Sequence, residues 1–271
     1  MPYCDGSVFT GDNDVVDANF AAALAADEEP VTLEEPIRYH RGLRNLSAGM
    51  DVAKRTFPKP RRITVAGTSA GGVGAMFFAP FLARFQYGNK VKKLTVFNDA
   101  GPVVSNPLAA DAAAARAADW AFDQYYPKSC TDCNALGQPA IALIDWRLAN
   151  DSTIREAFYG TDGDATLIFF TSVNLPGRPP LVPFDPANGV FGQTQASYRA
   201  LFVPEQGKLN TKYPKRYKRF VVSGDDTHTA IQFPLFYEQD ANGVFLNEWT
   251  ADFLGNKKGW TDVVEDFQPL P

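Results

Sequence analysis

The spacing of apolar residues predicts alternating helices and strands along most of the chain. Between residues 41 and 55, apolar side chains recur at steps of three and four, which places them on one face of a helix, and Pro58 and Pro60 then end it. Short apolar runs predict strands at 62–66, 93–98, 165–173 and 217–222. Further runs predict helices at 73–84, 107–125, 140–149, 193–202 and 245–253.

The order of these elements favours a parallel sheet. The strand at 62–66, a glycine-rich turn at Gly67–Gly74, a helix and the strand at 93–98 form a βαβ unit, whose two strands run parallel. We therefore expect an α/β fold with a mostly parallel sheet flanked by helices. The 271 residues are expected to form a single domain, 1–271.

Charge and hydropathy exclude two classes of function. A net charge of -5 argues against a nucleic-acid-binding protein, which needs a basic face to neutralise phosphates. No apolar run approaches the roughly 20 residues needed to span a bilayer, so we expect no membrane span. The first residues hold neither the basic start nor the apolar segment of a signal peptide.

The chain has three cysteines, and two of them, Cys130 and Cys133, form a C-x-x-C in an expected loop. A zinc site would need two more cysteine or histidine ligands, and only Cys4 and two histidines exist besides this pair. The pair is therefore expected to be a small loop disulfide or two ordinary thiols.

One motif carries candidate chemistry. Residues Gly67–Gly71 read G-x-S-x-G around Ser69, between an expected apolar strand and an expected apolar helix. In that context the serine stands on a sharp turn with its hydroxyl exposed, and the N–H of the next residue, Ala70, points to where an oxyanion would form. A phosphate-binding turn is the alternative, but the lysine of a P-loop and the glycine spacing of a dinucleotide site are missing. The motif favours a nucleophilic serine.

A serine nucleophile needs a base, and the chain offers only His40 and His228. In α/β-hydrolases the order along the chain is serine, acid, histidine. His228 follows Ser69 by 159 residues, in an expected loop after a strand, whereas His40 precedes it. We therefore predict His228 as the base.

The acid is expected in the loop after the third predicted strand, where it would orient the imidazole and stabilise its charged form. Asp185 is the nearest carboxylate in that loop and is the predicted acid. Asn174 stands where an aspartate would be natural, which suggests an impaired site. Three alternatives stay open: Asp99, which follows the strand after the serine turn, and Asp225 and Asp226, which lie close to the histidine in sequence.

Several segments, in the same order, resemble the pectin acetylesterase/Notum family of α/β-hydrolase carboxylesterases. They are Pro2–Asp12, Arg41–Leu46, Val65–Gly74, Asn98–Pro102, Asp226–Thr229, and Trp249 with Trp260–Val263. Together they reach over nearly the whole chain, and the set is far more specific than the serine motif alone.

The resemblance implies an α/β-hydrolase fold and a Ser-Asp-His triad that removes acetyl or longer acyl esters from carbohydrates or proteins. By position it assigns the nucleophile to Ser69, the base to His228 and an oxyanion N–H to Ala70. The acid of the family stands three residues before a glutamine, but Gly192 holds that place before Gln195 here.

A second departure concerns the beginning of the chain. In the family, a glycine-rich strand that contributes to the oxyanion hole precedes the segment that resembles Pro2–Asp12, and this chain begins at that segment. We therefore expect the first strands of the fold and most of the oxyanion hole to be missing. The longer natural form is expected to begin with an export signal and to be secreted or periplasmic.

The expected function is that of a serine carboxylesterase that removes O-acetyl or other acyl groups from a carbohydrate such as pectin. It would need no metal and no organic cofactor, and its partner would be the ester substrate. Two alternatives stay open: a catalytically impaired binding relative of the same fold, and an esterase of the lipase or polyester-depolymerase type.

Overall fold

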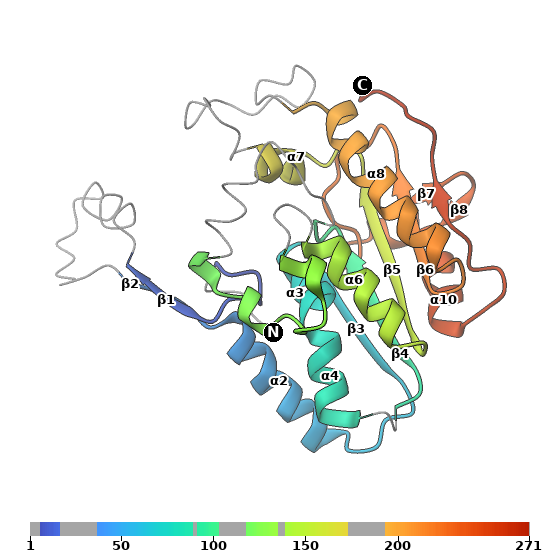
Figure 1. Cartoon of the computed structure of the whole chain (residues 1–271). Coiled ribbons are helices and arrows are strands. Elements are labelled where there is room, and N and C mark those ends of the chain that lie inside the picture. Colours follow the sequence, from blue (N-terminus) through green and yellow to red (C-terminus); the bar gives the residue numbers. More distant parts are fainter. Residues whose placement is uncertain are drawn as a thin grey trace.

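The centre of the fold is a five-stranded sheet, seen in a computed structural model that describes residues 6–16, 37–88, 91–102, 118–134, 139–172 and 193–270 (Figure 1). The strands lie in the order β3 (Ile63–Thr68), β4 (Leu94–Asp99), β5 (Ile154–Thr161), β6 (Tyr217–Val222) and β9 (Val263–Val264). Each strand pairs in parallel with the next, so all carboxyl ends lie at one end of the sheet.

Outside the central sheet, the described residues form, in the order of the chain, α-helices, short 3₁₀ turns and small antiparallel ribbons. The α-helices are α2 (Gly42–Thr56), α3 (Ala70–Phe77), α4 (Ala79–Tyr87), α6 (Pro139–Asn150), α7 (Ala165–Ser172), α8 (Gln195–Lys212), α9 (Leu235–Glu238) and α10 (Leu246–Gly255). Two 3₁₀ turns are η3 (Asp123–Tyr125) and η4 (Thr131–Asn134). Two antiparallel ribbons pair β1 (Asn13–Val16) with β2 (Ile37–His40), and β7 (Asp240–Ala241) with β8 (Val244–Phe245).

Successive side chains on a strand point to opposite faces of the sheet, and both faces are buried along β4, β5 and β6. On β4, Val96 belongs to an apolar cluster that includes residues of α3, α6 and α8. The next residue, Phe97, belongs to a second cluster built with α10. Two buried faces explain why this strand reads as a continuous apolar run rather than an alternating one.

Most of the predicted elements are confirmed. The strands expected at 62–66, 93–98 and 217–222 are β3, β4 and β6, and the helices expected at 41–55, 140–149, 193–202 and 245–253 are α2, α6, α8 and α10. The helix expected at 73–84 is two helices, since Pro80 in the first turn of α4 has no N–H to continue α3. Of the helix expected at 107–125, residues 107–117 lie outside the described residues.

The prediction of a strand at 165–173 is wrong, because residues Ala165–Ser172 form α7. The third strand of the sheet is β5, which the apolar pattern did not reveal. β5 carries Arg155 and Glu156 directly after its first residue, which interrupts the apolar pattern at the start of the strand. A short apolar run such as α7 fits a helix or a strand equally well until its contacts are known.

β3 is the end strand of the sheet within the described residues, where it pairs only with β4. An open groove of about 790 Å³ lies along it, lined by residues of α2 and β3 that include Met50 and Val65. Ser69 does not line this groove, so the groove is separate from the serine turn.

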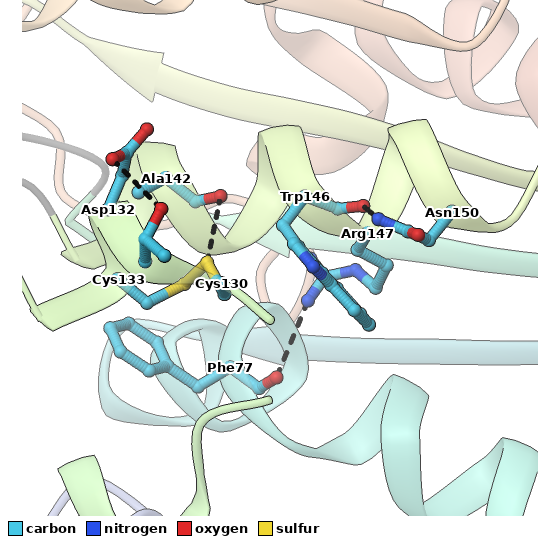
Figure 2. Close-up of a disulfide and its surroundings, with 9 residues drawn as sticks. Phe77, Cys130, Asp132, Cys133, Ala142, Trp146, Arg147 and Asn150 are labelled. Carbon is cyan, nitrogen blue, oxygen red and sulfur yellow. Dashed lines mark hydrogen bonds between the residues drawn. A yellow bond between two sulfur atoms is a disulfide. The ribbon is translucent and has the colours of Figure 1, made fainter. Parts of the chain in front are cut away.

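A disulfide lies beside α6, and Arg147 of α6 donates to the backbone carbonyl of Phe77 (Figure 2). Cys130 and Cys133 form a disulfide, buried in the same apolar cluster as Phe77, which decides between the two alternatives that the sequence left open. Arg147 of α6 donates two hydrogen bonds of 2.7 Å to the carboxylate of Glu156 on β5. Both charged side chains are 3% exposed.

We predict that Glu156→Gln lowers the free energy of unfolding by roughly 3 kcal/mol, because it leaves the buried guanidinium of Arg147 without a counter-charge. Urea denaturation of the variant measures the loss. As a control, the double variant Arg147→Met, Glu156→Leu should recover most of the stability, since it removes both charges. A single variant as stable as the wild type would contradict the prediction.

Candidate active site

Ser69 occupies a strained turn between β3 and α3. Its backbone has φ 53° and ψ -117°, a conformation that costs a non-glycine residue of order 1–3 kcal/mol and persists only when the surroundings enforce it. The N–H of Ser69 donates to the carbonyl of Asp99 at 2.8 Å, and the carbonyl of Ser69 accepts from the N–H of Val73 at 3.1 Å. The turn is therefore held from β4 on one side and from α3 on the other.

Glycines allow the close approach that this turn requires. A Cβ atom on Gly67 would lie 2.0 Å from the carbonyl oxygen of Gly71, and one on Gly72 would lie 2.8 Å from the Cα of Gly101. Gly101 is itself fixed by the side chain of Asn98, whose Oδ1 accepts its N–H at 2.7 Å. Strand, helix and the loop after β4 thus meet with no room for side chains.

His228 lies between Ser69 and a buried carboxylate. Its Nε2 is 2.7 Å from Oγ of Ser69, and its Nδ1 is 2.7 Å from Oδ2 of Asp164. With an ionised Asp164, the contacts fit the tautomer in which Nδ1 carries the proton and donates to the carboxylate, while Nε2 accepts from the serine hydroxyl. The His228 side chain is 22% exposed, whereas that of Asp164 is 0% exposed.

Asp164 is held by the start of α7. Its Oδ1 accepts the N–H of Leu167 at 2.8 Å, which leaves Oδ2 for the imidazole. Burial raises the pKa of the Asp164 carboxyl, and its hydrogen bond to His228 and the charge of His228 act in the opposite direction. The Asp164 side chain therefore holds the first turn of α7 and also faces His228.

Hydrogen bonds join the end of β5 and the loop at 162–164, which carries Asp164, to the loop at 223–234, which carries His228 and is here called the histidine loop. Gly163 N–H donates to the carbonyl of Asp225 at 3.1 Å, and the Thr161 hydroxyl donates to the carbonyl of Thr227 at 2.7 Å. A Cβ on Gly163 would lie 2.6 Å from the carbonyl oxygen of Asp225. Both loops follow neighbouring strands, β5 and β6, so the sheet places them side by side.

A second buried carboxylate, Asp162, stabilises this arrangement. It accepts hydrogen bonds from Gln195 Nε2 at 2.7 Å, Arg199 Nη1 at 2.7 Å, the Ser223 hydroxyl at 2.6 Å and the Gly224 N–H at 3.1 Å. These donors come from α8 and from the loop after β6. Asp162 therefore ties the end of β5 to both, next to the loop that carries Asp164.

Asp99 holds the histidine loop from the other side. Its carboxylate accepts the N–H of Ala230 at 3.1 and 3.2 Å and the N–H of Ile231 at 2.9 Å. Burial raises the pKa of the Asp99 carboxyl to about 6, against the lowering effect of these N–H groups and of His228.

The structure brings Ser69 and His228 together, and the carboxylate next to the imidazole is that of Asp164. The predicted acid, Asp185, and the alternative Asn174 lie outside the described residues. The acid is expected after the run at 165–173, whereas Asp164 precedes that run and follows β5, the third strand of the sheet.

The other candidates have different contacts. Asp99 binds the backbone after His228, Asp225 accepts the N–H of Thr227 at 2.8 Å, and Asp226 is exposed. His40 is fully buried on β2. Correct placement of β5 is the one signal that would have led from the sequence to Asp164.

Ala70 is the first residue of α3, so its N–H has no carbonyl partner within the helix and is available to an oxyanion. Within the described residues, no group of three or more histidine, cysteine, aspartate or glutamate side chains is arranged to hold a metal ion. None of the helices described is both long and apolar enough to cross a membrane.

No protein-family model matches this sequence, and no curated protein matches it. Among solved structures, the chain is similar to the Wnt deacylase Notum from Drosophila, with a TM-score of 0.60 and 14% sequence identity. The match covers 98% of this chain and 70% of the Notum chain. The likeness shows the fold. The protein has an α/β-hydrolase-like fold, as the sequence predicted.

We predict that Gly67→Ala disrupts the serine turn, because the added methyl would lie 2.0 Å from the backbone oxygen of Gly71. The variant should lose several kcal/mol of stability, about the size of other large single-residue losses, or fail to fold. Gly71→Ala is the matched control, since its nearest neighbour would be Phe9 at an ordinary 3.8 Å. Thermal unfolding of both variants decides, and equal unfolding midpoints would refute this account of the turn.

A further prediction concerns pH and Asp99, whose carboxyl pKa is raised from 3.8 to about 6 by burial. Between these values the folded protein holds a proton that the unfolded chain does not, so this group makes the fold less stable as the pH rises. At pH 7 the raised pKa of Asp99 lowers the free energy of unfolding by about 3 kcal/mol, since a pKa difference of one corresponds to roughly 1.4 kcal/mol. Asp99→Asn removes the titration, and its stability relative to wild type should rise by about that amount from pH 4 to pH 7. Urea denaturation at several pH values tests this, and a constant difference between the two proteins would contradict it.

Proposed function

We propose that this protein is a serine carboxylesterase that works through an acyl-enzyme on Ser69. The observation that carries the proposal is the continuous line from Asp164 to His228 to Ser69, with 2.7 Å at each step. A serine hydroxyl is a weak nucleophile by itself, and a base within hydrogen-bond reach, oriented by a third group, is what activates it.

In the first half of the reaction, the Ser69 Oγ attacks the ester carbonyl while His228 Nε2 takes the hydroxyl proton. Asp164 keeps the other ring nitrogen protonated and stabilises the imidazolium that forms. The Ala70 N–H, at the positive end of α3, stabilises the oxyanion of the tetrahedral intermediate. His228 then returns the proton to the leaving alcohol, which departs and leaves an acylated serine.

In the second half, water replaces the alcohol. His228 removes a proton from the water as it attacks the acyl-serine, and returns this proton to Ser69 Oγ as the carboxylic acid leaves. The enzyme is restored with no net change in its protonation. Every step uses side chains and one backbone N–H of this chain.

For the substrate, we propose an O-acetyl or other acyl ester of a carbohydrate such as pectin. The support is the set of sequence segments that resemble pectin acetylesterases, together with the fold shared with Notum, a protein described as a Wnt deacylase. The disulfide Cys130–Cys133 supports export, because such bonds persist mainly in oxidising compartments.

The alternative of an impaired binding relative rests on Asn174 as a failed acid and on the expected lack of the first strands. It loses the first of these two supports if Asp164, whose carboxylate is 2.7 Å from the imidazole, is the acid. An esterase of the lipase or polyester-depolymerase type stays a second candidate for the substrate, and chain-length preference distinguishes it.

The proposal is tested with a fluorophosphonate probe and p-nitrophenyl acetate. Wild-type protein should be labelled at Ser69, and Ser69→Ala and His228→Ala should lose esterase turnover by several powers of ten. Asp164→Asn should lower turnover by about 10⁴-fold, the loss seen when a serine-protease triad loses its aspartate charge. The matched control is Asp226→Asn, an exposed carboxylate two residues from His228, with turnover expected to be unchanged.

Unlabelled wild-type protein, or equal turnover in the Asp164 and Asp226 variants, would overturn the proposed mechanism. Release of acetate from acetylated pectin, compared with hydrolysis of p-nitrophenyl esters of increasing chain length, tests the proposed substrate. A strong preference for long chains would favour the lipase-type alternative instead.

A further inference from the structure

Asp99 contacts both halves of the Ser69–His228 pair through its own atoms. Its backbone carbonyl accepts the N–H of Ser69 at 2.8 Å, and its carboxylate accepts the N–H groups of Ala230 and Ile231, the second and third residues after His228. One residue at the end of β4 therefore fixes the turn of the nucleophile and the loop of the base.

The position of Asp99 in the sheet explains how it reaches both. β4 lies next to β3, which ends in the serine turn, and β5 lies on its other side. The histidine loop follows β6, two strands away, and must cross the end of the sheet to reach Ser69. The Asp99 carboxylate meets this loop at the far end of that crossing.

The residues around Asp99 are themselves rigidly held. Asp99 and Ala230 are both 0% exposed, and the next residue, Ala100, has φ 54° with its N–H bound to the carbonyl of Tyr159 at 2.9 Å. Strained, buried backbone of this kind persists where the surroundings enforce a functional geometry. A buried carboxylate is costly to stability, so its presence here calls for a reason other than stability.

We propose that Asp99 is a positioning residue that sets the distance between Ser69 and His228, acting through the backbone and not on the substrate. The proposal rests on the proposed esterase function. The carboxylate oxygens of Asp99 hold the histidine loop, so that the imidazole of His228 stays within hydrogen-bond reach of the Ser69 hydroxyl. Position is the requirement, so an uncharged acceptor of the same shape should serve nearly as well.

The test compares Asp99→Ala, which removes the acceptors, with Asp99→Asn, which keeps an oxygen in place. Asp99→Ala should lower kcat and the rate of fluorophosphonate labelling by about a hundredfold, the loss expected when a catalytic group is misplaced by an ångström. KM should stay near the wild-type value, and Asp99→Asn should regain most of kcat. Should Asp99→Ala not fold, Asp99→Ser replaces it, since its shorter side chain leaves a polar group but does not reach the loop.

Glu156→Gln is the matched control, because it also perturbs a buried carboxylate but lies away from Ser69 and His228. It should unfold more easily than wild type and keep the kcat of the folded enzyme. A kcat for Asp99→Ala that is unchanged per folded molecule would make the role of Asp99 structural only and overturn the proposal. Equal losses in the Asn and Ala variants would also overturn it, since charge and not position would then matter.

A measurement independent of turnover separates this proposal from the proposed function. The proton on Nδ1 of His228, in a 2.7 Å hydrogen bond to Asp164, should give a low-field NMR signal, and the same signal should be absent from His228→Ala. Asp99→Ala should broaden or shift this signal, whereas Glu156→Gln should leave it in place. If Ser69→Ala kept full esterase activity, the proposed function would fail, yet the NMR comparison would still decide whether Asp99 positions His228. An unmoved signal in Asp99→Ala would refute the positioning role.

Discussion

The close approach of β3, α3 and the loop after β4 is the constraint on which the site depends. It forces Ser69 into a backbone conformation with positive φ, which aims its hydroxyl away from the core. The approach is possible only because Gly67, Gly72 and Gly101 present no side chains at the contact. The helix that begins one residue later then directs its first free N–H groups to the same place.

The parallel sheet brings the remaining groups to that turn. Asp99 ends β4, and Ser69, Asp164 and His228 follow β3, β5 and β6, so the four residues lie at the ends of neighbouring strands. Because parallel strands end on the same side, residues up to 159 positions apart meet within hydrogen-bond distance. Two of these residues, Asp99 and Asp164, are fully buried carboxylates, which is the pattern expected where stability is given up for chemistry.

The electrostatics of the site follow from burial. Asp99 and Asp164 both lose contact with water, which raises the pKa of each carboxyl, and each is compensated by donors from the loops it must hold. Asp164 meets the imidazole, and Asp99 meets the backbone that carries the imidazole. Asp99 and Asp164 thus lie at the ends of neighbouring strands but have different partners. The partner of each is set by the part of the histidine loop that its carboxylate faces.

Local sequence was sufficient for the elements whose signals are local. The serine turn, the strands on either side of its helix, the single histidine placed after it and the strand before that histidine all rest on short-range rules of steric fit and apolar spacing. The carboxylate that faces His228 could not be reached in this way. β5 is buried with Glu156 inside it, because Arg147 of another element neutralises that charge, and no rule of local pattern foresees a partner brought by folding. Only the tertiary structure decided that Asp164 faces His228 and that Asp99 does not, since both choices depend on how loops after different strands pack against one another.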